Sequence, residues 1–216
     1  MIAAPEAART ALRPLRRRLR PTEVERRLAA LRLRRGDVAI DCGANVGEVA
    51  VVLADAGAEV HAFEPNPHAF SVLEARLGHR ANVHLYPVAV LDRDQPARLY
   101  LHRGSNHDAV AASVGSSLLE TKGNVDPDCF VDVRAIDLAR FVLALGRRIR
   151  LVKIDVEGVE HAILHRLLDS GAIELIETVL VEVHDAHVPS LRDETARLRA
   201  RLRTEGLDSR VLTDWR

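Results

Sequence analysis

The sequence predicts an α/β protein with a mostly parallel, doubly wound sheet. From Asp37 onward, short apolar runs alternate with segments of helical periodicity, the pattern of strands joined by crossover helices. A glycine turn directly follows the first apolar run, at the edge where open α/β sheets bind ligands. The length of 216 residues and the hydrophobic content of 47% suit one such domain better than two.

We expect five strands in the main sheet and helices after most of them. The predicted strands are residues 38–42, 59–63, 83–90, 151–155 and 179–184. The predicted helices are residues 46–55, 68–77, 159–168 and 190–204. In chain order, these elements form the strand–helix units from which parallel sheets are built.

An insertion, residues 91–149, separates the third and fourth predicted strands. It contains two stretches of alternating apolar residues, 97–102 and 130–136, which suit additional strands. Its centre, from Ser105 to Asn124, is rich in Gly, Ser and Asn. We therefore expect this centre to form a mobile lid that faces the substrate.

The chain is predicted to begin with a basic helical extension, residues 1–36, followed by the folded domain, residues 37–216. Residues 1–35 carry eleven arginines and three glutamates, a charge of +8, which leaves −8 on the rest of the neutral chain. Helices are expected over 6–20 and over about 22–32, the second begun by Thr22 and Glu25 as a capping box. Arginines 16–18 suit a solvated helix face, and the acidic domain argues against a nucleic-acid partner.

The cysteines and the hydropathy pattern predict a soluble cytoplasmic protein. Cys42 and Cys129 are too few for a disulfide scaffold, which favours reduced thiols. No stretch reaches the roughly 18 consecutive apolar residues of a membrane span, and the N-terminus lacks the apolar core of a secretory signal.

The first ligand-binding motif is the turn Asp41-Cys42-Gly43-Ala44-Asn45-Val46-Gly47. Gly43 and Gly47 permit positive φ angles and a close approach of a ligand to the main chain. A dinucleotide-binding turn usually has no acid here, because the start of the helix receives a pyrophosphate. Asp41 would repel a pyrophosphate but attract the ammonium and sulfonium groups of S-adenosylmethionine. The turn therefore favours a methyl donor.

The second motif is an acid at the end of the second predicted strand. Glu64, in Phe63-Glu64-Pro65-Asn66, follows the glycine turn by roughly twenty residues. At this spacing an acid accepts hydrogen bonds from ribose hydroxyl groups. A lone acid after a strand is commonly an exposed loop residue, but its pairing with the Asp41 turn favours a cofactor site.

A third motif, Lys153-Ile154-Asp155-Val156-Glu157-Gly158-Val159-Glu160, ends the fourth predicted strand and opens a helix. Taken with Asp-x-Gly-Ala-Asn-x-Gly and Phe-Glu-Pro-Asn-Pro, it resembles the signature set of the FkbM family of methyltransferases. The segments 116–118 and 133–138 are similar to family segments in the same order. The resemblance spans about residues 37–185.

The resemblance implies a Rossmann-like class I methyltransferase fold that uses S-adenosylmethionine, usually on hydroxyl groups of sugars, glycans or polyketide-type natural products. The residues it assigns to the donor are Asp41, Gly43, Ala44, Asn45 and Gly47 on the methionine side, and Glu64, Pro65, Asn66, Val88 and Ala89 on the ribose and adenine side. Only ten residues follow Gly206, too few for the two C-terminal strands of such folds. We expect a sheet edge that is either incomplete or completed by a partner chain, as in a homodimer.

Methyl transfer to a hydroxyl requires a base. Asp155 follows the fourth predicted strand, and Glu182 and His184 share a face at the end of the fifth. We expect His184 or Asp155 to take the proton, with Glu182 in the same catalytic group. Asp155, Glu182 and His184 also suit Mg²⁺, which would acidify the hydroxyl. Asp155 and Glu157 alternatively cap the following helix.

Three other functions are compatible with parts of the sequence. A methyltransferase for RNA or protein is disfavoured by the 3% aromatic content and the absence of an Asn-Pro-Pro-aromatic motif. A non-catalytic subunit with a donor-binding fold would support a partner enzyme through the unfinished sheet edge. A nicotinamide-dependent reductase is disfavoured by Asp41.

Overall fold

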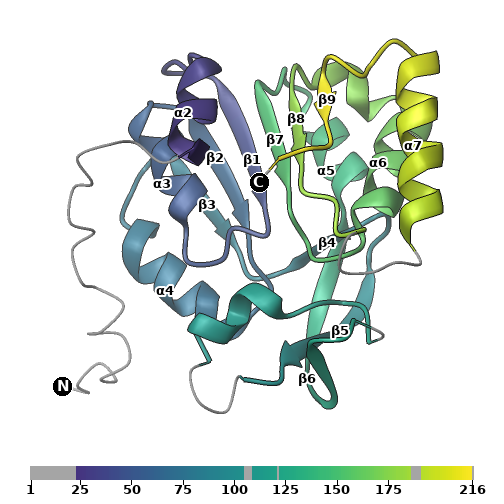
Figure 1. Ribbon diagram of the computed structural model, residues 1–216. Helices are drawn as coiled ribbons and strands as arrows, with labels where there is room; N and C mark the ends of the chain where they lie inside the picture. The colour runs from purple at the N-terminus through teal and green to yellow at the C-terminus, as the bar shows by residue number, and fades with distance from the viewer. Residues whose placement is uncertain (1–22, 105–108, 121, 186–190, 216) are drawn as a thin grey trace.

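The computed structural model describes residues 23–104, 109–120, 122–185 and 191–215. Its main sheet has six strands in the order β3-β2-β1-β7-β8-β9, and every neighbouring pair is parallel (Figure 1). The strands are β1 (Val38–Cys42), β2 (Glu59–Phe63), β3 (Val83–Tyr86), β7 (Leu151–Ile154), β8 (Val179–Val181) and β9 (Val211–Leu212). The strand order reverses between β1 and β7, which makes their carboxyl ends a ligand-binding crevice. The predicted doubly wound α/β fold is confirmed.

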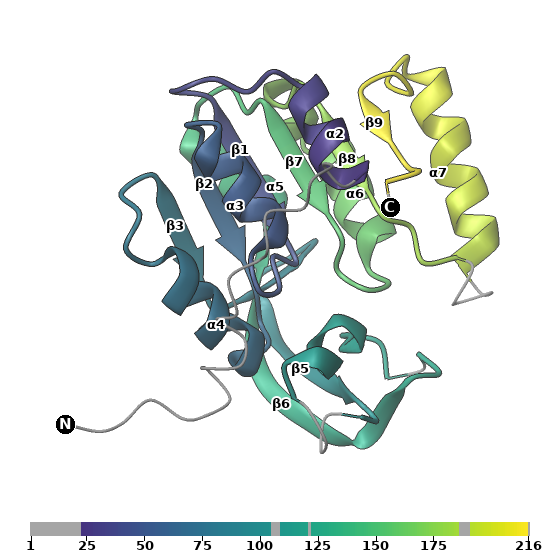
Figure 2. The ribbon, with the colours of Figure 1, turned by 60° about the vertical axis from the view of Figure 1, so that its left-hand side comes forward.

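Helices cover both faces of the main sheet (Figures 1 and 2). One face carries α2 (Glu23–Ala30), α3 (Glu48–Asp55) and α4 (Pro67–Leu77), and the other α5 (Leu138–Leu145), α6 (Glu160–Asp169) and α7 (Arg192–Thr204). Adjacent residues of β1 alternate between the two cores: Ala39 packs in the cluster of Leu53, and Ile40 in the cluster of Ile163. Burial on both faces explains why these strands are apolar throughout.

The prediction of a single strand over residues 83–90 is wrong. β3 ends at Tyr86, and Ala89–Leu91 forms β4 in a second sheet of order β4-β6-β5. Pro87 lies between the two strands and has no N–H to donate to a ladder, so the pairing with β2 stops there. In the second sheet, β6 (Val125–Asp137) pairs with β4 in parallel and with β5 (Gln95–His102) antiparallel.

The insertion therefore contains the two strands expected from its alternating stretches, but it also contains a helix that we did not predict. Asp137 caps α5 by accepting a hydrogen bond from Arg140 N at 3.1 Å, and Gly146 follows the helix with a φ of 59°. Leu138 and Val142 face the core. The cap and the glycine are ordinary helix signals in the sequence, and they account for a helix where we expected only strands.

The first and last segments that the structure describes, α2 and the residues after β9, meet on one face of the sheet. Leu28 of α2 is buried in the core, and Arg27 Nη1 donates to the carbonyl of Asp214 at 3.1 Å. The expected helix over 6–20, the arginines 16–18 and the capping residue Thr22 lie outside the described residues. At the C-terminal edge the sheet gains one strand of two residues, β9, rather than two strands. None of the described helices is both long and apolar enough to span a membrane.

Candidate functional site

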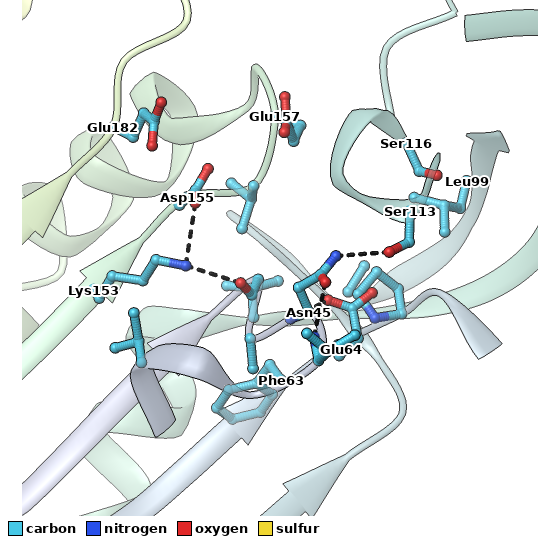
Figure 3. A pocket seen from close by; sticks show the side chains of 18 of the residues that line it. Asn45, Phe63, Glu64, Leu99, Ser113, Ser116, Lys153, Asp155, Glu157 and Glu182 are labelled. Atoms are coloured by element: carbon cyan, nitrogen blue, oxygen red, sulfur yellow. Dashed lines mark hydrogen bonds and ion pairs between the residues drawn. The ribbon is translucent and has the colours of Figure 1, made fainter. Parts of the chain in front are cut away.

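A cavity of about 340 Å³ lies at the carboxyl ends of β1, β2, β7 and β8, and we call it the main cavity (Figure 3). Residues Ala89 and Val90 of β4, Leu99 of β5 and the segment around Ser113 and Ser116 line the side that belongs to the insertion. The volume falls within the range of small-molecule sites. Its place matches the crevice that the strand order creates.

The glycine turn forms the floor of the main cavity. Gly43 has a φ of 78°, and a Cβ at this position would lie 1.8 Å from the carbonyl oxygen of Asp155. Gly47 has a φ of 87°, and its Cβ would lie 2.7 Å from Leu73 Cδ1 of α4. Between them Asn45 adopts a φ of 48°, which is uncommon for a residue with a side chain. The turn thus brings β1, β7 and α4 together, and only glycine fits at both ends.

Glu64 is held in place by the backbone on either side of the cavity floor. Its Oε2 accepts a hydrogen bond from Asn45 N at 2.8 Å, and its Oε1 accepts one from Asn66 N at 2.7 Å. Asn66 in turn caps α4, because its Oδ1 accepts from His68 N and Ala69 N. Burial raises the pKa of Glu64 to about 7, although the two backbone hydrogen bonds lower it. The carboxylate is therefore fixed in position and titrates near neutral pH.

Two serines of the insertion extend this hydrogen-bond system. Asn45 Nδ2 donates to Ser113 Oγ at 2.8 Å, and Asn66 Nδ2 donates to Ser116 Oγ at 3.2 Å. Ser113 lies in the short 3₁₀ helix η1 (Ala111–Gly115), inside the segment that we expected to be a lid. The sequence places these serines fifty or more residues from their partners, so sequence spacing did not indicate these contacts, although Ser116 lies in a segment that resembles the family.

Lys153 is a functional candidate that the sequence reasoning missed. Its Nζ donates to the carbonyl of Gly43 at 2.8 Å and lies 3.3 Å from Asp41 Oδ1 and 3.2 Å from Asp155 Oδ2. The ammonium is almost completely buried, and its pairing with the two acids raises its pKa despite the opposing effect of burial. A lysine between Val152 and Ile154 in a buried strand was the signal, since a buried charge needs partners.

A second polar group lies beside the main cavity, around the turn that follows β7. Glu157 forms ion pairs with Lys122 and with His184 Nε2, the latter at 3.1 Å, and these contacts lower its pKa against the effect of burial. His184 Nδ1 lies 2.9 Å from Glu160 Oε1. Burial opposes protonation of His184, but the hydrogen bonds to Glu157 and Glu160 outweigh it and raise the pKa to about 10. His184 is therefore protonated at neutral pH.

The carboxylate of Glu160 holds this turn in place through hydrogen bonds to its backbone. It is fully buried and accepts hydrogen bonds from Val156 N and Gly158 N at 3.2 and 3.0 Å. Glu157 has a φ of 65°, so the turn is strained and depends on these contacts. The last residue of the motif thus holds the loop that carries Asp155 and Glu157.

Most of the residues expected from the sequence line the main cavity. They are Gly43, Ala44, Asn45, Glu64, Pro65, Ala89, Asp155 and Glu182. The expected residues outside the lining are Asp41, Gly47, Asn66, Val88 and His184. Asp41, Asn66 and His184 are buried. Each of these three contacts a lining residue: Lys153, Glu64 and Glu157 respectively.

The ligand atoms suited to a metal ion also differ from the expected set. Asp155, Glu157 and His184 each place one such atom within 4.8 Å of the other two. Glu157 thus takes the place that we expected for Glu182. His184 Nε2 is 3.8 Å from Asp155 Oδ1, and the Lys122 ammonium already contacts Glu157.

Comparisons with known proteins give a family and one informative relative. The family model described as "Methyltransferase FkbM domain" matches residues 41–209. The relative is the "31-O-demethyl-FK506 methyltransferase FkbM" of Streptomyces tacrolimicus, which is 32% identical over 179 residues, 71% of this chain and 67% of that protein. The resemblance stated from the three motifs is confirmed.

Two solved structures are more distant. A precorrin 8W decarboxylase of Methanobacterium thermoautotrophicum has 19% identity and a TM-score of 0.45, covering 87% of this chain and 74% of that chain. A hypothetical protein of Thermus thermophilus has 19% identity and a TM-score of 0.38, covering 78% and 75%. Likeness at these scores supports neither a shared activity nor a shared substrate.

Proposed function

The chain belongs to the FkbM methyltransferase family and is an S-adenosylmethionine-dependent methyltransferase, and from this premise we propose that it methylates a hydroxyl oxygen of a sugar, a glycan or a polyketide-type small molecule. The printed name of the Streptomyces relative describes methylation of an oxygen. The observation that carries the proposal for this chain is the charge of the main cavity, which contains carboxylates both for a cationic donor and for an acceptor proton.

The lining of the main cavity fits S-adenosylmethionine. Among the described residues, its acidic lining residues are Glu48, Glu64, Asp155, Glu157 and Glu182. The lysine in this part of the lining, Lys153, already contacts two acids and a carbonyl. Such a surface attracts the ammonium and sulfonium of the donor and repels the pyrophosphate of a dinucleotide. Gly43 and Ala44 of the glycine turn line the cavity without a large side chain, so the donor can approach the main chain there.

The ribose of the donor is assigned to Glu64. The backbone N–H groups of Asn45 and Asn66 fix both carboxylate oxygens, each of which keeps capacity for a further hydrogen bond. Two vicinal hydroxyl groups are the ligands that such a fixed carboxylate accepts best. Ala89 and Val90 provide apolar surface on the adenine side.

The proton of the acceptor is assigned to Glu182. His184 is unsuited to take it, since its nitrogens face Glu157 and Glu160 and it is already protonated. Asp155 is paired with Lys153, whereas within the described residues no hydrogen bond or ion pair holds the Glu182 carboxylate. Burial, and then the charge of Asp155, raise the pKa of Glu182, which makes it a stronger base than an ordinary glutamate.

The transfer then follows from the position of these groups. S-adenosylmethionine supplies, when bound, a methyl group on a sulfonium that needs no further activation. The protein aligns the hydroxyl oxygen with that methyl group. As the carbon–oxygen bond forms and the carbon–sulfur bond breaks, the hydroxyl proton passes to Glu182. Asp155 and Lys153 form a fixed ion pair at the floor of the site, between the proposed base and the donor, and keep the two in position relative to each other.

The experiment combines acceptor screening with two isosteric variants. Purified protein is incubated with S-adenosylmethionine and a panel of sugars, glycans and hydroxylated polyketides, and S-adenosylhomocysteine is measured with the position of the new methyl group. We expect methyl ethers only. Glu182→Gln should lower turnover by roughly 100-fold or more, with the affinity for S-adenosylhomocysteine changed by less than about threefold.

Glu174→Gln, at a side chain that is 71% exposed, is the matched control and should behave as wild type. Loss of turnover in Asp155→Asn but not in Glu182→Gln would transfer the role of base to Asp155. Methylation of nitrogen, or transfer to RNA or protein in preference to every hydroxyl acceptor, would overturn the proposed acceptor class.

A further inference from the structure

Three side chains with metal-binding atoms lie together on the sheet, away from the main cavity. Glu59 and His61 are two residues apart on β2 and therefore share a face. His84 of β3 is the register partner of His61, so its side chain lies on the same face. Glu59 begins β2, whereas the main cavity lies at the other end of that strand, beyond Phe63.

Glu59 and His61 already have the separation of two ligands of one metal ion, and His84 lies somewhat farther away. Glu59 Oε1 lies 3.3 Å from His61 Nε2 and 3.9 Å from His84 Nε2, and all three atoms lie within 4.8 Å of one another. A tetrahedral zinc ion with bonds of about 2.0–2.1 Å holds its ligand atoms roughly 3.3 Å apart. His84, whose side chain is 46% exposed, must move closer to the other two ligands to complete the site.

His61 is oriented as a ligand before any ion binds. Its Nδ1 lies 2.9 Å from the hydroxyl of Tyr86, which leaves Nε2 to face Glu59. The edge of the ring packs against Phe141 of α5, with ring centroids 5.4 Å apart. Metal-binding histidines typically have their second nitrogen fixed in this way.

Arg147 is the present partner of Glu59. Its Nη1 lies 2.9 and 2.8 Å from the two carboxylate oxygens, and its side chain is 46% exposed. The guanidinium approaches from solvent, so an ion can displace it without rearrangement of the core. The competition between Arg147 and a metal ion also offers a direct test.

We propose that Glu59, His61 and His84 form a binding site for one zinc ion or a similar late first-row divalent ion, with water in the open position. Two imidazoles and one carboxylate are a donor set suited to zinc, nickel and copper rather than to magnesium. The site joins β2 to β3 at the edge of the main sheet and takes no part in methyl transfer. Its expected effect is on stability, because the ion binds the folded chain only.

The test is calorimetric titration of the untagged full-length protein with Zn²⁺ alone, after removal of metals with a chelator and dialysis. We expect one ion bound, and a melting temperature raised by roughly 5 °C at a hundred times Kd. His84→Ala changes an exposed residue and should weaken this binding at least tenfold. Arg147→Ala should strengthen it, since the competing cation is gone.

Two controls distinguish the proposed site from other binding. His79→Ala alters another exposed histidine and should leave the titration unchanged. His184→Gln alters the group beside the main cavity and should also leave it unchanged. Zinc binding that persists in His84→Ala but disappears in His184→Gln would place the ion beside the main cavity and overturn the proposal, as would the absence of binding in wild type.

Discussion

Gly43 approaches the backbone of Asp155 so closely that a Cβ on residue 43 would lie 1.8 Å from the Asp155 carbonyl oxygen. The contact joins the ends of β1 and β7, where Asp155 N also donates to the carbonyl of Cys42 at 3.1 Å. Because the obstructing atom belongs to the backbone, no change of rotamer relieves the clash. The floor of the main cavity therefore depends on the absence of a side chain at this position.

Gly43→Ala should disrupt the crevice and lower the free energy of unfolding by about 3 kcal/mol or more. Gly36→Ala is the matched control, because Gly36 also has a positive φ, 92°, but has nothing within 4 Å of its Cβ position. That variant should lose only about 1 kcal/mol from the strained φ. Urea unfolding measures both, and equal losses would show that the contact with Asp155 is unimportant.

The affinity for the donor product should rise with pH through neutrality. Burial raises the pKa of Glu64 to about 7. In the free protein, the Glu64 carboxyl group is therefore mostly protonated at pH 6 and mostly ionised at pH 8. Only the ionised carboxylate accepts from both ribose hydroxyls, and the affinity for S-adenosylhomocysteine should increase about tenfold between these values. Calorimetry of wild type and Glu64→Gln checks this, with weaker and pH-independent binding expected in the variant.

The raised pKa of Glu64 has the opposite consequence for stability: the free protein should become less stable as pH rises. The folded pKa of Glu64 lies above its ordinary value of 4.5, so its contribution is fully present below about pH 4.5 and is lost as pH rises through about 7. Wild type should therefore lose stability relative to Glu64→Gln across this window. An unchanged difference between the two proteins from pH 4.5 to 8 would contradict the raised pKa.

The sequence predicted what depends on neighbours in the chain. The strand Glu59–Phe63 and the turn from Asp41 to Gly47 have local signals, an apolar run and two glycines, and both lie where we expected them. Pro87 is an equally local signal, and it contradicts the prediction of one long strand over residues 83–90. The separation of β3 from β4 follows from that proline.

The remainder of the site arises from contacts between distant segments. Ser113 meets Asn45 across 68 residues, and Lys122 meets Glu157 across 35, so neither pair has a signature in sequence spacing. The role of His184 depends on three-dimensional packing for the same reason. Its residue type suggested a base, whereas its position between two carboxylates raises its pKa and makes it a cation at neutral pH.

Trp215 offers a direct optical signal for occupation of the main cavity. It is the single tryptophan of the chain, is 3% exposed and lines the cavity, and its backbone N–H group donates to the Val181 carbonyl at 3.2 Å. Ligand binding changes the surroundings of the indole on its cavity side, so the emission spectrum should change as S-adenosylhomocysteine is added. The midpoint should equal the calorimetric Kd.

Trp215→Phe should abolish this signal and retain binding within about threefold, because an aromatic ring still lines the cavity at this position. Glu64→Gln should shift the midpoint to higher ligand concentration and keep the amplitude. A spectrum that stays constant while calorimetry reports saturation would place the bound ligand away from Trp215.

Methyl transfer should be insensitive to removal of divalent metals. The group of Asp155, Glu157 and His184 has the ligand types of a metal site, but cations already occupy the positions around Glu157, namely the Lys122 ammonium and protonated His184. A third cation would have to separate these ion pairs and leave charged side chains without partners, which is costly in a partly buried site. We therefore expect the same turnover with and without EDTA. Lys122→Met should lower turnover by roughly tenfold or more, because it leaves the turn around Glu157 with one cation fewer.

Loss of activity in EDTA that Mg²⁺ restores would show instead that the metal displaces Lys122 during the reaction. Lys122→Met would then bind Mg²⁺ more tightly than wild type.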